Sequence, residues 1–137
     1  MTLRNLRSIL IGCTLLLLAA CAVFQLPTAP VKFSNGVLVN NAGMTLYTYD
    51  KDSRGKSNCT GQCATNWPPL KATASDKAGG YYSLVTRDDG SLQWAYDGMP
   101  LYLWVKDQKP GDKTGDGVNK VWHVVSEPVM DNSGGGY

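Results

Sequence analysis

Two cysteines separated by three residues, Cys59 and Cys63, carry the clearest chemical signal in the sequence. One turn of helix between them would bring their Cα atoms to about 6 Å, a distance that a disulfide tolerates. A metal-binding thiolate pair or a redox-active dithiol usually has a two-residue spacing, and no histidine follows Cys63 to make a haem-attachment motif. The spacing favours a structural disulfide worth about 2 kcal/mol, while the metal and redox alternatives stay open.

Candidates for acid–base catalysis are few. His123, the single histidine, lies in an apolar segment beside Trp122, where a partly buried packing residue is commoner than a general base. No serine lies in a nucleophile-elbow motif, and no glycine-rich loop follows a strand to hold phosphate. Several aspartates fall at predicted strand ends or turns, where aspartate caps the backbone: Asp50, Asp52, Asp88, Asp89, Asp97 and Asp107. Glu127 is the single glutamate, and the sequence predicts a protein that is not an enzyme and needs no cofactor.

Metal binding is the weaker alternative. Residues 50–55 and 112–117 resemble calcium loops, but neither continues to the bidentate glutamate that closes such a loop. Soft ligands for copper are present: Met44, Met99, Met130, His123 and the cysteine pair. Met44 and Met99 occupy equivalent positions of an internal repeat, which favours a packing role for both.

The first twenty residues resemble a bacterial lipoprotein signal peptide. Arg4 and Arg7 precede an apolar run that is too short for a comfortable membrane span. The run ends in Leu-Ala-Ala-Cys, which resembles a lipobox, and this resemblance implies cleavage before Cys21 and its acylation, for example with palmitate. Ala22 stands where an aspartate would retain the protein at the inner membrane, so an outer-membrane location is expected if the organism is Gram-negative.

Charge and composition predict the remaining organisation. The formal net charge of +2 falls to zero once Arg4 and Arg7 are removed, so nothing favours binding to nucleic acid. Residues 21–30 contain two prolines and read as a lipidated tether, and residues 131–137 read as a flexible tail. Residues 31–130 between them are enough for one domain with a modest core.

A segment of this domain occurs twice. Residues 43–52 return as residues 98–107, and the same offset places Trp67 on Trp122. A match that ends in an aligned pair of tryptophans, which is the rarest residue type in proteins generally, indicates one structural unit used twice. The repeated residues are therefore expected to build the scaffold.

The local pattern predicts an all-β domain of antiparallel strands with long loops and at most short helical turns, near residues 59–65 among other places. Short runs rich in β-branched and aromatic residues are joined by Asn35-Gly36, Asp89-Gly90 and Asp97-Gly98, which are strong hairpin signals. Alternation places Tyr47 and Tyr49 on one face of a strand, and Tyr102 and Trp104 on the equivalent face of the other copy. The prolines after Trp67 are expected to end strand pairing there.

Tyr47, Tyr49 and Asp52, followed by Tyr102, Trp104 and Asp107, fit the pattern Tyr-x-[Phe/Trp/Tyr]-x-x-Asp twice. This pattern resembles a family of predicted bacterial lipoproteins, also described as a secreted repeat of unknown function. The resemblance extends over further short segments: residues 57–64, 67–70, Asp89-Gly90, Gln93-Trp94, Gly98, Pro100-Leu101-Tyr102, Pro110-Gly111-Asp112 and Val121-Trp122. It implies a secreted, membrane-anchored domain, and it brings no activity, substrate or cofactor.

The sequence therefore predicts a non-enzymatic envelope lipoprotein that binds or scaffolds an envelope protein or glycan. An aromatic face left uncovered would provide the binding platform, whereas burial of both strand faces would make those aromatic residues core. The alternative is a metal-handling or electron-transfer accessory protein of the envelope.

Overall fold

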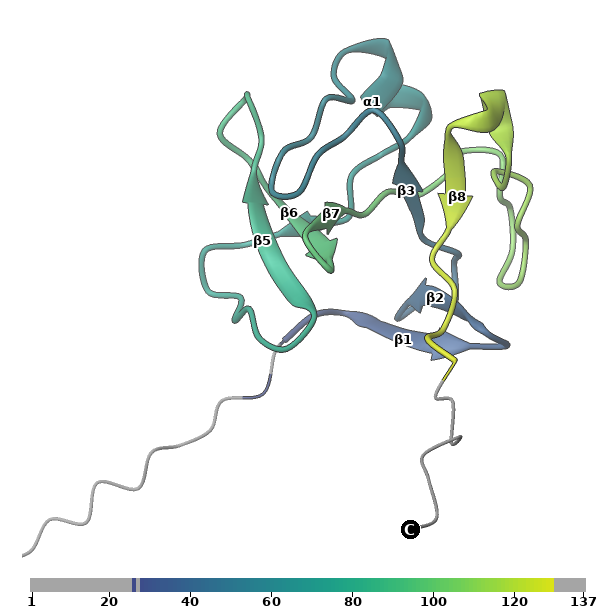
Figure 1. Cartoon of the computed structure of the whole chain (residues 1–137), viewed down its shortest axis with the longest axis horizontal. Coiled ribbons are helices and arrows are strands. Elements are labelled where there is room, and N and C mark those ends of the chain that lie inside the picture. Colours follow the sequence, from purple (N-terminus) through teal and green to yellow (C-terminus); the bar gives the residue numbers. More distant parts are fainter. Residues whose placement is uncertain (1–25, 27, 130–137) are drawn as a thin grey trace, which may run out of the picture.

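The computed structural model describes residue 26 and residues 28–129. Within them the chain is built from short antiparallel strands, one single-turn helix and one 3₁₀ turn (Figure 1). The elements are β1 (Val31–Ser34), β2 (Val37–Asn40), β3 (Tyr47–Tyr49), α1 (Gln62–Asn66), β4 (Lys71–Ala72), β5 (Tyr82–Thr86), β6 (Leu92–Tyr96), β7 (Met99–Pro100), η1 (Val118–Lys120) and β8 (Trp122–Val124). The predicted all-β class is confirmed. The predicted signal peptide, Cys21, Met130 and the tail lie outside the described residues.

The predicted hairpins form where their turn residues stand. Asn35 and Gly36 join β1 to β2, and Asp97 and Gly98 join β6 to β7. All four residues have positive φ, between 46° and 79°, as a two-residue hairpin turn with the twist of the flanking strands requires. In Figure 1 the hairpin of β1 and β2 lies at the lower end of the molecule and α1 at the upper end.

The strands form three small antiparallel sheets. β1 pairs with β2, β3 pairs with β8, and β6 pairs with β5 on one edge and with β4 and β7 on the other. The expectation that the prolines after Trp67 end strand pairing is wrong. The carbonyl of Pro68 accepts a hydrogen bond from the Leu103 N–H, because a proline lacks only the donor.

Successive residues of the repeated strand enter two different cores. Leu46 and Leu101 belong to one cluster of buried side chains, whereas Tyr47 and Tyr102 belong to a second cluster with Trp67 and Trp122. Neighbouring side chains of a strand point to opposite faces, so both faces of each copy are covered. The aromatic platform considered for Tyr102 is therefore interior, since Tyr47 and Tyr102 are completely buried.

The two repeats exchange their last segments. β8, from the end of the second repeat, pairs with β3 of the first. In the equivalent place, Pro69 of the first repeat forms a bridge with Tyr102 of the second. Between these segments, Tyr47 and Tyr102 exchange two backbone N–H to carbonyl hydrogen bonds of 2.9 Å. Two equivalent residues that pair with each other mark the axis of an approximate two-fold symmetry.

Candidate functional site

The motif tyrosines and aspartates bond across the two repeats. The Tyr47 hydroxyl donates to Asp107 Oδ2, and the Tyr102 hydroxyl donates to Asp52 Oδ2, both at 2.6 Å. All four side chains are at least nine-tenths buried. A short hydrogen bond to a buried carboxylate is among the stronger kinds, so each motif holds the other in place.

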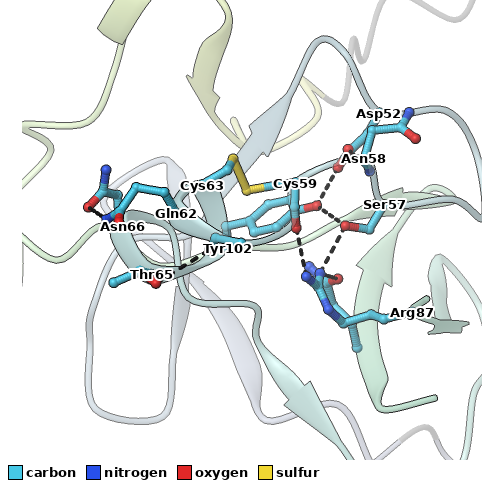
Figure 2. Close-up of a disulfide and its surroundings, with 12 residues drawn as sticks. Asp52, Ser57, Asn58, Cys59, Gln62, Cys63, Thr65, Asn66, Arg87 and Tyr102 are labelled. Atoms are coloured by element: carbon cyan, nitrogen blue, oxygen red, sulfur yellow. Dashed lines mark hydrogen bonds between the residues drawn. A yellow bond between two sulfur atoms is a disulfide. The ribbon is translucent and has the colours of Figure 1, made fainter. Parts of the chain in front are cut away.

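The pair of Tyr102 and Asp52 is part of a longer buried chain of hydrogen bonds (Figure 2). Ser57 Oγ lies 2.7 Å from the Tyr102 hydroxyl, and Arg87 Nη1 donates to Ser57 Oγ at 2.8 Å. Arg87 also donates to Gln93 Oε1 and to the Cys59 carbonyl, at 2.6 and 2.7 Å. The chain connects the positive charge of the buried guanidinium to the Asp52 carboxylate through two hydroxyl groups.

The pair of Tyr47 and Asp107 is held differently. Asp107 Oδ1 accepts from the backbone N–H and the hydroxyl of Thr114, and the Gly115 N–H donates to the Tyr47 hydroxyl at 3.3 Å. A Cβ atom at Gly115 would lie 2.8 Å from the Trp67 ring and 2.9 Å from the Tyr47 ring. Only glycine fits in this position, because real Cβ atoms do not approach so closely.

Burial shapes the proton affinities of these groups. Desolvation raises the pKa of Tyr47 and of Tyr102 well above the ordinary value of 10, and the hydrogen bond to a carboxylate raises it further. Burial also raises the pKa of Asp52, against the opposing effect of the hydrogen bonds from Tyr102 and Asn58. The two phenols therefore stay protonated at every physiological pH and act as fixed donors.

The residues at the third position of the motif, Tyr49 and Trp104, are the outer rings of a stack of four aromatic rings. Tyr49 stacks on Trp122 with a centroid distance of 4.2 Å, Trp122 on Trp67 at 3.8 Å, and Trp67 on Trp104 at 3.9 Å. The two central rings are nearly parallel and almost fully buried, whereas the outer rings are partly exposed. Each outer ring packs on the central tryptophan of the opposite repeat. The tyrosine, the aromatic residue and the aspartate of each motif therefore all contact the other repeat.

Cys59 and Cys63 form a disulfide with a Cα–Cα distance of 5.2 Å. It joins the segment before α1 to the first turn of that helix, as Figure 2 shows. Cys59 is fully buried in the cluster of Tyr102 and Trp122. The disulfide thus fixes the loop that supplies Ser57 and the Cys59 carbonyl to Arg87.

The other candidate ligands do not converge. His123 is exposed on β8, not packed inside as predicted, and its Nε2 lies 2.9 Å from Asp50 Oδ2. Trp122 and Val124 take the inward positions on either side of it. Met44 and Met99 are half-buried. Among the described residues, no three side chains of histidine, cysteine, aspartate or glutamate come together as metal ligands.

The aspartates predicted as turn caps divide into two groups. Asp89 accepts from the Ser91 N–H and hydroxyl, as a turn residue does, and Asp97 pairs with Arg54. Asp52 and Asp107 also accept local N–H groups, but in addition they hold the buried tyrosines. Local turn chemistry therefore does not account for the hydrogen bonds that these two aspartates accept from Tyr102 and Tyr47.

An open aromatic groove lies outside the repeated motif. It has a volume of about 180 Å³ and is lined by Phe33, Tyr81, Tyr82, Tyr96, Glu127 and Pro128. Tyr81 is 67% exposed, in contrast to the buried motif tyrosines. The groove residues come from β1, the turn before β5 that contains Tyr81, β5, β6 and the segment after β8, which meet only in the folded protein.

Sequence reasoning missed the groove, and it also missed Arg87, Ser57 and Gln93. A signal for Arg87 exists, because strand alternation places it on the same face as buried Val85. No comparable signal brings Phe33 together with Tyr81 and Glu127, which lie far apart along the chain.

The family comparison agrees with the two-repeat architecture. A family model described as a secreted repeat of unknown function matches residues 30–71 and residues 83–126. The chain belongs to this family of secreted repeats, and the two matched segments are the two halves that exchange their ends. No curated protein and no solved structure matches the chain. No helix in the described part of the chain is long and apolar enough to cross a membrane.

Replacement of Gly115 by alanine tests the close packing between the repeats. The added methyl group meets the rings of Trp67 and Tyr47, so we expect Gly115→Ala to lower the free energy of unfolding by about 1–3 kcal/mol. Lys113→Ala, on the exposed surface of the same loop, is the matched control and should change it by less than about 0.5 kcal/mol. Urea denaturation measures both, and equal stability of the two variants would contradict the packing.

The buried phenols predict a loss of stability at alkaline pH. Above pH 10 tyrosines of the unfolded chain lose protons that Tyr47 and Tyr102 retain in the fold, so the unfolding free energy falls as pH rises. Each phenol contributes a slope of up to about 1.4 kcal/mol per pH unit. In Tyr102→Phe the fall in unfolding free energy between pH 10 and 11 should be smaller by about 1 kcal/mol, because an unfolded tyrosine is only partly deprotonated over that range. Val105→Ala, at an exposed position without a titratable group, should keep the wild-type slope, and an unchanged slope in Tyr102→Phe would contradict the assignment.

Proposed function

We propose that this protein is a lipid-anchored, non-enzymatic binding domain of the cell envelope, with its ligand site in the aromatic groove. The observation that carries the proposal is the contrast between the two sets of aromatic side chains. Tyr47, Tyr102, Trp67 and Trp122 are buried in the interior. The groove instead presents exposed Tyr81 beside the partly buried rings of Tyr96 and Phe33. Aromatic side chains presented in this way are typical of binding sites.

The engagement of the acidic groups supports a role without catalysis. Each carboxylate oxygen of the buried Asp52 and Asp107 accepts at least one hydrogen bond, from a tyrosine, a backbone N–H or the Thr114 hydroxyl. His123 faces Asp50 at the surface, away from either buried pair. A general acid or base needs access to a substrate proton, which these buried carboxylates lack.

The anchor is proposed from the sequence of the first 21 residues. A basic start, an apolar run and a terminal Leu-Ala-Ala-Cys suit acylation at Cys21. Two or three acyl chains make a durable anchor, since each buried methylene contributes about 0.8 kcal/mol. The near-neutral mature chain has no charge surplus for nucleic acid, so the expected partners are the membrane, through the lipid, and an envelope molecule.

One observation favours the alternative of an electron-transfer accessory protein. The four stacked rings run in continuous contact from partly exposed Tyr49 to partly exposed Trp104. A tyrosine hydrogen-bonded to a carboxylate lies edge-on to each central tryptophan, with centroid distances of 5.4 and 5.2 Å. In this alternative a one-electron acceptor protein would oxidise Tyr47 or Tyr102, and the phenol proton would pass to Asp107 or Asp52. Electron paramagnetic resonance would detect the tyrosyl radical.

Substitution of the lipobox cysteine tests the anchor. In Cys21→Ser we expect loss of fatty-acid labelling and release of the protein from the membrane fraction, because serine offers no thiol for acylation. Cys13→Ser removes a cysteine within the predicted signal peptide and should leave labelling and fractionation unchanged. If Cys21→Ser still incorporated fatty acid and stayed in the membrane fraction, Cys21 would not be the site of the lipid anchor.

Ligand screening of the groove tests the binding role. The full chain, purified in a maltoside detergent, would be screened by saturation-transfer NMR against peptidoglycan fragments, envelope oligosaccharides and lipid headgroups. We expect a ligand whose affinity falls by about tenfold or more in Tyr81→Ala, as for an aromatic residue at a binding hot spot. Val105→Ala, at an exposed position outside the groove, should bind normally. Failure of every ligand class to bind at the groove would overturn the proposed function.

A further inference from the structure

The rings of the groove surround Tyr96 at different tilts. Phe33, Tyr81 and Tyr82 lie with ring centroids 5.8, 5.7 and 5.5 Å from that of Tyr96, at interplanar angles of 81°, 39° and 57°. Rings arranged so unequally do not form a flat stack. Together with Glu127 and Pro128 they line an open groove of about 180 Å³, which is smaller than a drug-sized pocket. The groove therefore suits a compact group.

The electrostatic character of the groove is negative. Glu127 lines it, and the other lining residues are the four aromatic ones and Pro128. Burial raises the pKa of Tyr82 and of Tyr96, so these phenols remain neutral at physiological pH. The faces of neutral aromatic rings carry negative electrostatic potential, which adds to the charge of the carboxylate.

Neighbouring charges do not cancel this character. Asp97, next to Tyr96 in the chain, is held by Arg54 through two hydrogen bonds of 2.8 and 2.9 Å between the side chains. The positive charge of Arg54 is therefore paired with the Asp97 carboxylate and does not offset the negative charge of Glu127. Lys32, next to Phe33 on β1, lines a different cavity, together with Val37 and Lys113. Within the described lining of the groove, Glu127 is thus the residue that sets the net charge.

Building on the proposed function, we propose that this groove binds a quaternary ammonium group, such as the trimethylammonium group of choline. A quaternary ammonium carries a positive charge inside an apolar surface of methyl groups and has no N–H donor to satisfy. Aromatic faces and one carboxylate fit it on both counts. A phosphate would be repelled by Glu127, and a primary ammonium would lose strong hydration without several acceptors to replace it.

A matched pair of ligands tests the role of the charge. Choline and its neutral carbon analogue, 3,3-dimethylbutan-1-ol, have the same shape, and each gives one nine-proton NMR signal. With the full chain in maltoside detergent, we expect choline to bind by saturation-transfer NMR, and the neutral analogue to bind at least about fivefold more weakly. Equal affinity of the two ligands would overturn the proposal and leave a simple apolar groove.

Matched variants place the cation in the groove. Glu127→Gln keeps the size of the side chain and should weaken choline binding by about fivefold or more, and Tyr81→Ala should weaken it as well. Asp88→Asn, which removes an exposed carboxylate paired with Lys56 outside the groove, is the control and should bind choline normally. Normal affinity in both Glu127→Gln and Tyr81→Ala would show that the cation binds elsewhere.

Two further experiments identify the source of the cation and distinguish failure of this proposal from failure of the proposed function. Binding to phosphatidylcholine vesicles, abolished in Glu127→Gln, would assign the ligand to a lipid headgroup, whereas binding of free choline alone would assign it to a solute. Binding of neutral glycans at the groove without choline would overturn the cation but keep the binding role. Binding of nothing at the groove would overturn both.

Discussion

The hydrogen bond from a buried phenol of one repeat to a buried carboxylate of the other is the interaction on which the rest of the structure depends. Neither partner could be interior alone, because an unpaired buried carboxylate or hydroxyl costs several times what a satisfied one contributes. The exchange occurs twice, between Tyr47 and Asp107 and between Tyr102 and Asp52. It fixes the register of the central backbone pairing and the approach of the two tryptophans. The residues of the repeated Tyr-x-[Phe/Trp/Tyr]-x-x-Asp pattern thus form the interface between the two repeats.

The division of roles between inside and outside follows from this interface. The aromatic residues that the repeats share pack in the second core, and the shared leucines pack in the first, which leaves little of the motif for a ligand. The parts that differ between the halves supply the individual features, such as Arg87 with its hydrogen-bonded loop and the groove around Tyr96. The proposed ligand site accordingly lies in one of these unequal parts.

Local signals predicted much of the fold, and long-range contacts account for what they missed. Turn residues with positive φ specified the hairpins at Asn35-Gly36 and Asp97-Gly98, because those turns depend on four neighbouring residues. The pairing of β3 with β8 joins segments more than seventy residues apart and has no local signature. For the same reason the aspartates of the motif looked like turn caps, and His123 looked packed although its strand turns it toward Asp50. The repeat itself contained the missing information, since equivalent residues near a two-fold axis contact one another.

The exchange of end segments also explains why two copies stand in one chain. A lone repeat would lack the strand that covers its own aromatic row, and it could acquire that strand only from a second molecule. Such a dimer would dissociate on dilution, because its stability depends on protein concentration. Joining the copies by a short connection makes the encounter intramolecular, at an effective concentration set by the linker and not by expression level. Each molecule can therefore stay folded on its own, even at low protein concentration.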